Sequence, residues 1–103
     1  MKPRPMLERD VESKIGDFAK KRGCLYYKFT SPAKRAVPDR MIITPEGVIG
    51  FLEIKAQGKK PTALQRIEIE RLQVQGCTAD WCDTVEKGCL FVTKLLDRKT
   101  EFC

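Results

Sequence analysis

The sequence has no histidine among its 103 residues. Histidine is the commonest general base and a member of the usual nucleophilic triads, so its absence removes both routes to hydrolysis. The five cysteines are odd in number, unevenly spaced and include no CxxC pair, which argues against a structural zinc site. Any hydrolytic chemistry must therefore rest on carboxylates, lysine and a metal ion, and we expect no organic cofactor.

Long hydrophobic runs are missing too. No apolar stretch approaches the roughly 18 residues of a membrane span, and the start Met-Lys-Pro-Arg-Pro lacks the apolar segment of a signal peptide. We therefore expect no membrane partner, a cytoplasmic location and reduced, buried or incidental thiols. The length predicts one small domain over residues 1–103.

Charge is plentiful and unbalanced. Lys and Arg number 20 against 14 Asp and Glu, which gives a net charge of +6 and a pI near 9.2. This excess favours a polyanionic partner such as nucleic acid, although a charge of this size is also compatible with plain solubility.

Two short motifs carry the chemistry: Pro38-Asp39, and Glu53-Ile54-Lys55 after an apolar hairpin. Carboxylates are hard oxygen ligands for Mg²⁺ or Mn²⁺, and such a metal polarises a phosphate and activates water. Side chains alternate along a strand, so Glu53 and Lys55 share one face. Exposed Glu-x-Lys pairs are common on strands, but Glu53 ends a run that is apolar on both faces, where a solvated ion pair is less expected.

The turn between the two motifs decides how close the carboxylates lie. Thr44-Pro45-Glu46-Gly47 is typical of a type I turn. A two-residue loop would put Asp39 opposite Leu52, and a three-residue loop would put it opposite Glu53. Either register leaves the carboxylates within one step.

Periodicity predicts the elements around these motifs. Helices are predicted over residues 6–22, 63–75 and, more weakly, 85–96; strands are predicted over 25–29, 41–44, 48–54 and 79–83. The order α-β-β-β-α-β-α predicts an α/β fold with a central mixed sheet flanked by helices. We expect Tyr26 and Tyr27 to pack in the core or on the sheet, and Trp81 to lie in the core.

These residues together resemble the VRR-NUC branch of the PD-(D/E)xK nuclease superfamily. The shared features run in order along residues 7–96: a glutamate on the first helix, Tyr27-Lys28-Phe29, Ser-Pro-x-x-Arg-x-x-Pro-Asp over 31–39, Phe-Leu-Glu-Ile-Lys over 51–55, and Gln65 after a Lys-Pro-Thr loop. One departure is Ala36, where a small glycine is frequent. The resemblance implies a restriction-endonuclease-like fold.

The resemblance also implies roles for single residues. Glu12, Asp39, Glu53 and the Ile54 backbone carbonyl would hold Mg²⁺ or Mn²⁺. Lys55 would be the catalytic lysine, and Gln65 would support the lysine or the phosphate.

Two of these assignments have rivals in the sequence. Glu8 lies one turn before Glu12 and could serve instead; we favour Glu12 because Gly16, one turn later, lets the helix approach the sheet closely. Thr62-Ala63-Leu64-Gln65 is a capping box in which Gln65 would bond back to the Thr62 amide, and the two roles are compatible.

Polar residues flank the motifs on both sides. Ser31, Lys34 and Arg35 precede Pro38-Asp39, and Lys59 and Lys60 follow the Glu-x-Lys strand. All five are candidates for contacts with DNA phosphates, and solvated loop positions are the alternative.

The functional hypothesis is a Mg²⁺- or Mn²⁺-dependent DNA endonuclease. Short stand-alone members of this branch look like homodimers that cut branched DNA such as four-way (Holliday) junctions, and so small a domain has no room for a base-reading module. The size is also typical of a phage gene, active in an infected bacterial host. The alternatives are a flap, nicking or restriction-type nuclease subunit, or a non-catalytic DNA-binding module with the same fold.

Overall fold

The predicted order of elements is confirmed. The computed structural model describes residues 4–32 and 36–98, and each observed element agrees with its predicted range to within two residues at either end. The elements are α1 (Glu8–Lys21), β1 (Leu25–Lys28), β2 (Arg40–Ile43), β3 (Ile49–Ile54), α2 (Ala63–Val74), β4 (Thr78–Cys82) and α3 (Val85–Asp97).

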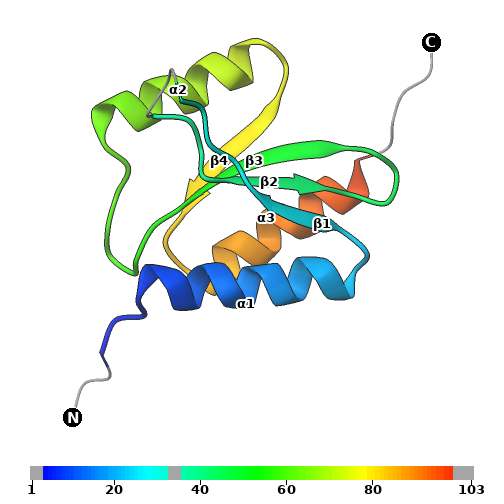
Figure 1. Cartoon of the computed structure of the whole chain (residues 1–103), viewed down its shortest axis with the longest axis horizontal. Helices are drawn as coiled ribbons and strands as arrows, with labels where there is room; N and C mark the ends of the chain where they lie inside the picture. Colours follow the sequence, from blue (N-terminus) through cyan, green and yellow to red (C-terminus); the bar gives the residue numbers. More distant parts are fainter. Residues whose placement is uncertain (1–3, 33–35, 99–103) are drawn as a thin grey trace.

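The strands form one mixed sheet in the order β1-β2-β3-β4 (Figure 1). β1, β2 and β3 pair antiparallel, whereas β3 and β4 run parallel, joined by the crossover through α2. Helices α1 and α3 lie on one face of the sheet, and α2 lies on the other, packed mainly on β4 (Figure 1). The predicted α/β architecture is therefore the one observed.

The core lies between the sheet and the α1–α3 layer. The apolar stripe of α1, with Val11, Ile15 and Ala19 fully buried, meets the inward side chains of the central strands, including Leu52 and Ile54. Burial of each such aliphatic side chain contributes roughly 1.5–3 kcal/mol to folding. Where α1 crosses α3 the packing is close: a Cβ at Gly88 would collide with the Ile15 side chain.

The β2–β3 hairpin has the three-residue loop. Thr44 N donates to Val48 O at 2.9 Å, and Gly47 turns the chain with φ +83°, a left-handed conformation that glycine adopts at little cost. The resulting register pairs Arg40 with Leu52, so the next position outward puts Asp39 level with Glu53. Of the two registers that the sequence allowed, this one brings the carboxylates closest.

The sheet face on the α2 side is only partly covered, and the expectation for the aromatic residues is correct only in part. Tyr26 packs against the core, but Tyr27 is 51 % exposed. Trp81 is half-buried at the edge strand β4 and is not part of the core cluster, so its core assignment was wrong. Its neighbours Arg66 and Lys87 come from separate helices, which no local sequence pattern predicts.

Four cysteines lie in the described ranges, and all four are free thiols. Cys24 and Cys82 are buried, and Cys77 and Cys89 are half-buried. Burial raises the pKa of the Cys82 thiol to about 12, which keeps it protonated and unreactive. Within residues 4–32 and 36–98, the helices are too short or too polar to cross a bilayer.

Candidate functional site

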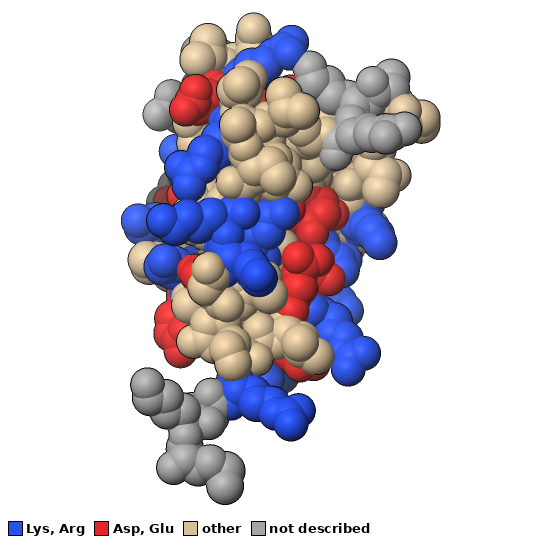
Figure 2. All heavy atoms as spheres, turned by 90° about the vertical axis from the view of Figure 1, so that its left-hand side faces the viewer, with Lys and Arg blue, Asp and Glu red and all other residues tan. Residues whose placement is uncertain are grey.

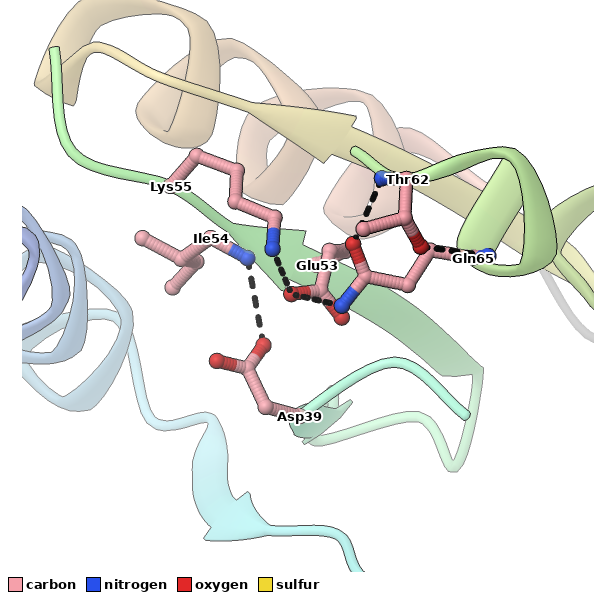
Figure 3. Close-up of polar contacts among 6 residues, drawn as sticks. All are labelled: Asp39, Glu53, Ile54, Lys55, Thr62 and Gln65. Carbon is pink, nitrogen blue, oxygen red and sulfur yellow. Dashed lines mark hydrogen bonds and ion pairs between the residues drawn. The ribbon is translucent and has the colours of Figure 1, made fainter. Parts of the chain in front are cut away.

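The two motifs meet where β2 begins and β3 ends. Asp39 directly precedes β2, and its Oδ1 accepts a hydrogen bond from the Ile54 backbone N at 3.1 Å (Figure 3). This contact ties the Pro-Asp segment to the Glu-x-Lys strand across the sheet. Pro38, immediately before it, is fully buried and helps to fix the backbone there.

Glu53 is the most enclosed of these carboxylates. It is 4 % exposed, and its Oε2 lies 3.4 Å from Lys55 Nζ and 3.5 Å from Gln65 Nε2 (Figure 3). Burial raises the pKa of Glu53, and the nearby Lys55 ammonium opposes that rise. The alternation of β3 thus sets Glu53 and Lys55 side by side, as the Glu-x-Lys spacing predicted.

Gln65 completes the predicted capping box and also contacts the site, where its observed partner is Glu53. Its Oε1 accepts from the Thr62 N at 2.9 Å, and the Thr62 hydroxyl accepts from the Gln65 N at 3.2 Å, which completes the capping box of α2. The remaining amide group, Nε2, is the one directed at Glu53 (Figure 3). The N-terminus of α2 therefore reaches the carboxylate through one side chain.

The first turns of α1 supply two more carboxylates. One oxygen each from Glu8, Glu12 and Asp39 lies within 4.8 Å of the others. The backbone around Glu12 is fixed because its carbonyl accepts from the Tyr26 hydroxyl at 2.8 Å, and the Tyr26 ring fits against the bare Gly16. The predicted close approach at Gly16 is observed, and it brings Glu8 to the cluster together with Glu12.

The cluster concentrates negative charge, and Asp39 within it is half-buried. Burial raises the pKa of Asp39 to about 7, with further contributions from the charge of Glu53 and the hydrogen bond to Glu12. A bound cation would relieve this cost. The donors are carboxylate oxygens, without imidazole or thiolate, which fits Mg²⁺ or Mn²⁺ better than zinc or copper.

Arg40 is a site residue that the sequence reasoning missed. Its guanidinium lies 3.3 Å from Glu12 Oε2 and over the ring of Tyr26, with Cζ 4.7 Å from the ring centroid. Asp39 and Arg40 are consecutive, so alternation turns Arg40 toward α1; this was the available signal. Glu8, weighed only as a substitute for Glu12, is found beside it.

Three of the five predicted DNA-contacting residues lie in described loops. Ser31 is half-buried, Lys59 and Lys60 are exposed, and Lys34 and Arg35 lie outside the described residues. The loop that carries Lys59 and Lys60 is anchored by the Gly58 N, which donates to Asp83 Oδ2 at 3.1 Å. Figure 2 shows Lys and Arg side chains gathered across the middle of this end of the molecule, beside a group of Asp and Glu.

A sequence relative of this chain is a nuclease by name. No protein-family model matches the chain. It is 44 % identical over 69 residues to a protein of Acyrthosiphon pisum secondary endosymbiont phage 1 named "Putative nuclease p44", an alignment that covers 67 % of this chain and 74 % of that protein.

The fold of the chain also matches solved structures of VRR_NUC domains. The fold matches a structure titled "VRR_NUC domain" with a TM-score of 0.77 and 27 % identity, over 89 % of this chain and 96 % of that one. A second, titled "VRR_NUC domain protein", matches in fold with a TM-score of 0.69 at 22 % identity, over 89 % and 92 % of the two chains. With the Pro-Asp and Glu-x-Lys strands joined as described, the chain belongs to the VRR-NUC family of nucleases.

Proposed function

We propose that this chain is a Mg²⁺- or Mn²⁺-dependent, structure-specific DNA endonuclease. The observation that supports this best is the convergence of Asp39, Glu53 and Lys55 at one sheet end, with Glu8 and Glu12 closing the site from α1. Asp39, Glu12 or Glu8, Glu53 and the Ile54 backbone carbonyl would hold the metal. When bound, the ion polarises the scissile phosphate and lowers the pKa of an attacking water.

Lys55 supplies a positive charge beside the reacting phosphate. Its ammonium is held 3.4 Å from Glu53, so it is positioned in advance to orient a water and to offset charge that builds up on the phosphate oxygens. Gln65 keeps the Glu53 carboxylate in place from the other side. Ser31, Lys34, Arg35, Lys59 and Lys60 would contact the phosphates that flank the cleaved bond.

Branched DNA, such as a four-way junction, is the substrate that we propose. The site lies on an exposed sheet end bordered by cations, and binding through phosphates reads shape rather than sequence. A two-fold dimer would present two such sites to a junction of matching symmetry.

An uncovered apolar surface supports the dimer. On the α2 side of the sheet Leu25, Tyr27 and Ile49 are 45–51 % exposed. The flank of α2 turned away from Trp81 adds a row that is 51–84 % exposed: Leu64, Ile67 and Val74. We call these six residues the apolar face; it offers on the order of 700 Å² at about 200 Å² per large side chain, close to one partner's share of a standard interface.

The apolar face has two parts, a ridge formed by the α2 row and a floor formed by the three sheet residues. This pairing favours a second copy of the chain as its partner. The α2 row borders a hollow of about 400 Å³ along the helix, which Ile67 and Val74 line together with charged neighbours, and the sheet residues lie on strands β1 and β3. A two-fold interface needs both halves on one molecule, because each ridge packs on the other copy's floor. Nucleic acid is a poor partner for this face, since none of its six residues is charged.

A cleavage assay tests the enzyme and its substrate together. End-labelled four-way junction, flap and linear duplex are incubated with the chain in Mn²⁺, in Mg²⁺ and in EDTA, beside Lys55→Ala. Paired, symmetric cuts in the junction are expected, and they should disappear in EDTA. In Lys55→Ala they should fall by at least about 100-fold, the size typical of losing one electrostatic catalytic group. Lys20→Ala, an exposed lysine on α1, is the matched control and should cleave normally.

Other outcomes would replace parts of the proposal. Equal cutting of all three DNAs would retain the nuclease and remove the junction preference, and sequence-dependent cutting of linear duplex would indicate a restriction-type subunit. Retained DNA binding with no cutting in either metal would indicate a non-catalytic binding module. Metal binding is read separately, as the rise in melting temperature of the DNA-free chain when Mn²⁺ is added.

A further inference from the structure

Trp81 is the single tryptophan of the sequence, and it lies at the edge of the sheet between two cations. The Arg66 Cζ is 5.8 Å from the ring centroid, and the Lys87 Nζ is 5.7 Å from it. Hollows of about 170 Å³ on the α2 side and about 160 Å³ on the α3 side both include the ring in their lining. The indole is half-buried, and each cation lies over the ring, so a planar ligand would have to displace one of them to stack there. Tryptophan is one of the most costly side chains to leave in contact with water.

The ring lies next to the catalytic strand. Trp81 on β4 is the register partner of Glu53 on β3, so their Cα atoms are about 4.8 Å apart and their side chains leave the same face of the sheet. The first turn of α2 spans the pair: Gln65 reaches Glu53, and its neighbour Arg66 reaches Trp81. A phosphate bound beside Glu53 would therefore place a neighbouring nucleotide close to this ring.

Cations and a carboxylate both border the ring: Asp80 lines both hollows, with Arg66 on the α2 side and Lys87 and Lys94 on the α3 side. Lys87 is held in place by Asp83 Oδ1 at 3.2 Å, and the other oxygen of Asp83 accepts from Gly58 N in the loop that carries Lys59 and Lys60. Asp83 thereby fixes the loop and Lys87 relative to each other. Lys55, Lys59, Lys60 and Lys87 form the route that a phosphate backbone would follow past the sheet end.

We propose that Trp81 is a stacking platform for an unpaired nucleobase beside the cleaved phosphate, with Arg66 and Lys87 contacting the adjoining phosphates. Every base has a π face, so a tryptophan accepts any of them and gives no sequence preference. Paired bases inside a duplex are not available to it, whereas bases at a branch point open at lower cost. The inference rests on the proposed nuclease function and narrows its substrate to branched DNA in which a base beside the cut is unpaired or can open.

The fluorescence of Trp81 tests this directly, because no other tryptophan contributes to the signal. The full chain is titrated in EDTA with a forked duplex that has single-stranded arms, and with a blunt duplex of the same sequence. Stacking is expected to quench the emission by about half or more with the fork, and much less with the blunt duplex when both are at saturation. Equal quenching by both DNAs, or none by either, would overturn the inference.

Substitutions give a second, independent readout. Trp81→Leu keeps an apolar side chain and should weaken binding to a labelled fork by about 5- to 100-fold while leaving blunt-duplex binding unchanged; Trp81→Phe should recover most of the loss. Lys87→Ala keeps the ring and should weaken binding to both DNAs alike. Unchanged fork affinity in Trp81→Leu would reject the platform, and if that variant does not fold, the quenching of the unmodified chain decides.

The titrations in EDTA measure DNA binding without cleavage, so the stacking platform and the nuclease function are tested by separate experiments. Cleavage of branched DNA without fork-specific quenching would retain the proposed function and reject the platform. Fork-specific quenching without cleavage in Mn²⁺ would retain the platform and reject the proposed nuclease function.

Discussion

At the scale of single residues, the site is a set of carboxylates held closer together than their charges favour. Asp39 is the clearest case, because burial and the neighbouring acids raise its pKa to about 7. A carboxyl whose pKa is higher in the folded state binds its proton more tightly when folded. Its contribution to stability is therefore full below about pH 4, its unfolded pKa, and is lost as the pH rises to about 7.

Asp39→Asn should consequently stabilise the metal-free protein at pH 8. The amide oxygen can still accept from Ile54 N, while the buried charge is gone. After discounting for solvent screening we expect a gain on the order of 1–2 kcal/mol, or about 4–10 °C in melting temperature at pH 8 in EDTA, shrinking toward zero at pH 4. Asp17→Asn, an exposed position on α1, is the control and should change little at either pH.

A lower melting temperature for Asp39→Asn at pH 8 would contradict this electrostatic account. It would mean that the ionised carboxylate stabilises the fold through its hydrogen bond more than its burial costs. The same variant should lose the rise in melting temperature that Mn²⁺ gives to the unmodified chain, because one ligand has lost its charge.

Residue types and spacing predicted part of this site and not the rest. Asp39, Glu53 and Lys55 could be found because strand alternation and one turn place them, and both are local properties of the sequence. The meeting of Glu8 with Asp39 and of Arg40 with Glu12 depends on how α1 lies against the sheet. That packing is set by Gly16 and Tyr26 together, which are distant in the sequence.

At the scale of elements, α2 connects helix stability to the site through Gln65. The sequence predicted the order and bounds of the elements well because each is marked locally: α1 by its apolar stripe, the hairpin by Pro45 and Gly47, and α2 by its capping box. It predicted less about which side chains line up across elements. The Trp81 edge is formed by α2, β4 and α3 together, and no single element carries its signal.

Two substitutions separate the two contacts of Gln65. Gln65→Glu keeps an oxygen for the Thr62 amide but loses the donor to Glu53 and adds a like charge beside it, so cleavage should fall while helicity is retained. Thr62→Ala removes the cap and should cost about 1 kcal/mol of stability, with a smaller loss of activity. Cleavage rates with saturating Mn²⁺ and denaturant midpoints measure the two effects. Full activity in Gln65→Glu would show that the contact with Glu53 has no part in the reaction.

At the scale of the whole molecule, one sheet face is buried under α1 and α3 while the other keeps large apolar side chains in water. Exposed large apolar side chains gathered on one side of a molecule often mark a protein–protein interface. The sequence did not predict which face of the sheet stays uncovered, because Leu25, Tyr27 and Ile49 alternate along their strands as core residues would. Their exposure follows from α2 packing mainly on β4, which leaves the other strands open on that side.

Substitution of the apolar face should therefore give monomers. The unmodified chain is expected at twice 11.8 kDa by light scattering at micromolar concentration. Ile67→Glu places a charge in the middle of the exposed α2 row without lowering helix propensity. Leu25→Thr removes apolar area from the sheet part of the apolar face and introduces a β-branched residue, which strands favour. Each should shift the mass toward the monomer, by weakening dimerisation about 10-fold or more.

Leu90→Glu is the matched control, because Leu90 is 53 % exposed on α3, on the opposite side of the sheet. It should stay dimeric, and all three variants should keep the far-UV spectrum of the parent. If the face joins two nuclease sites, the monomeric variants should still nick a junction in Mn²⁺ but should lose paired cuts, since each monomer then meets the DNA alone. A monomeric parent chain, or dissociation by Leu90→Glu and not by Ile67→Glu, would assign the apolar face another partner and remove the structural basis for paired cleavage.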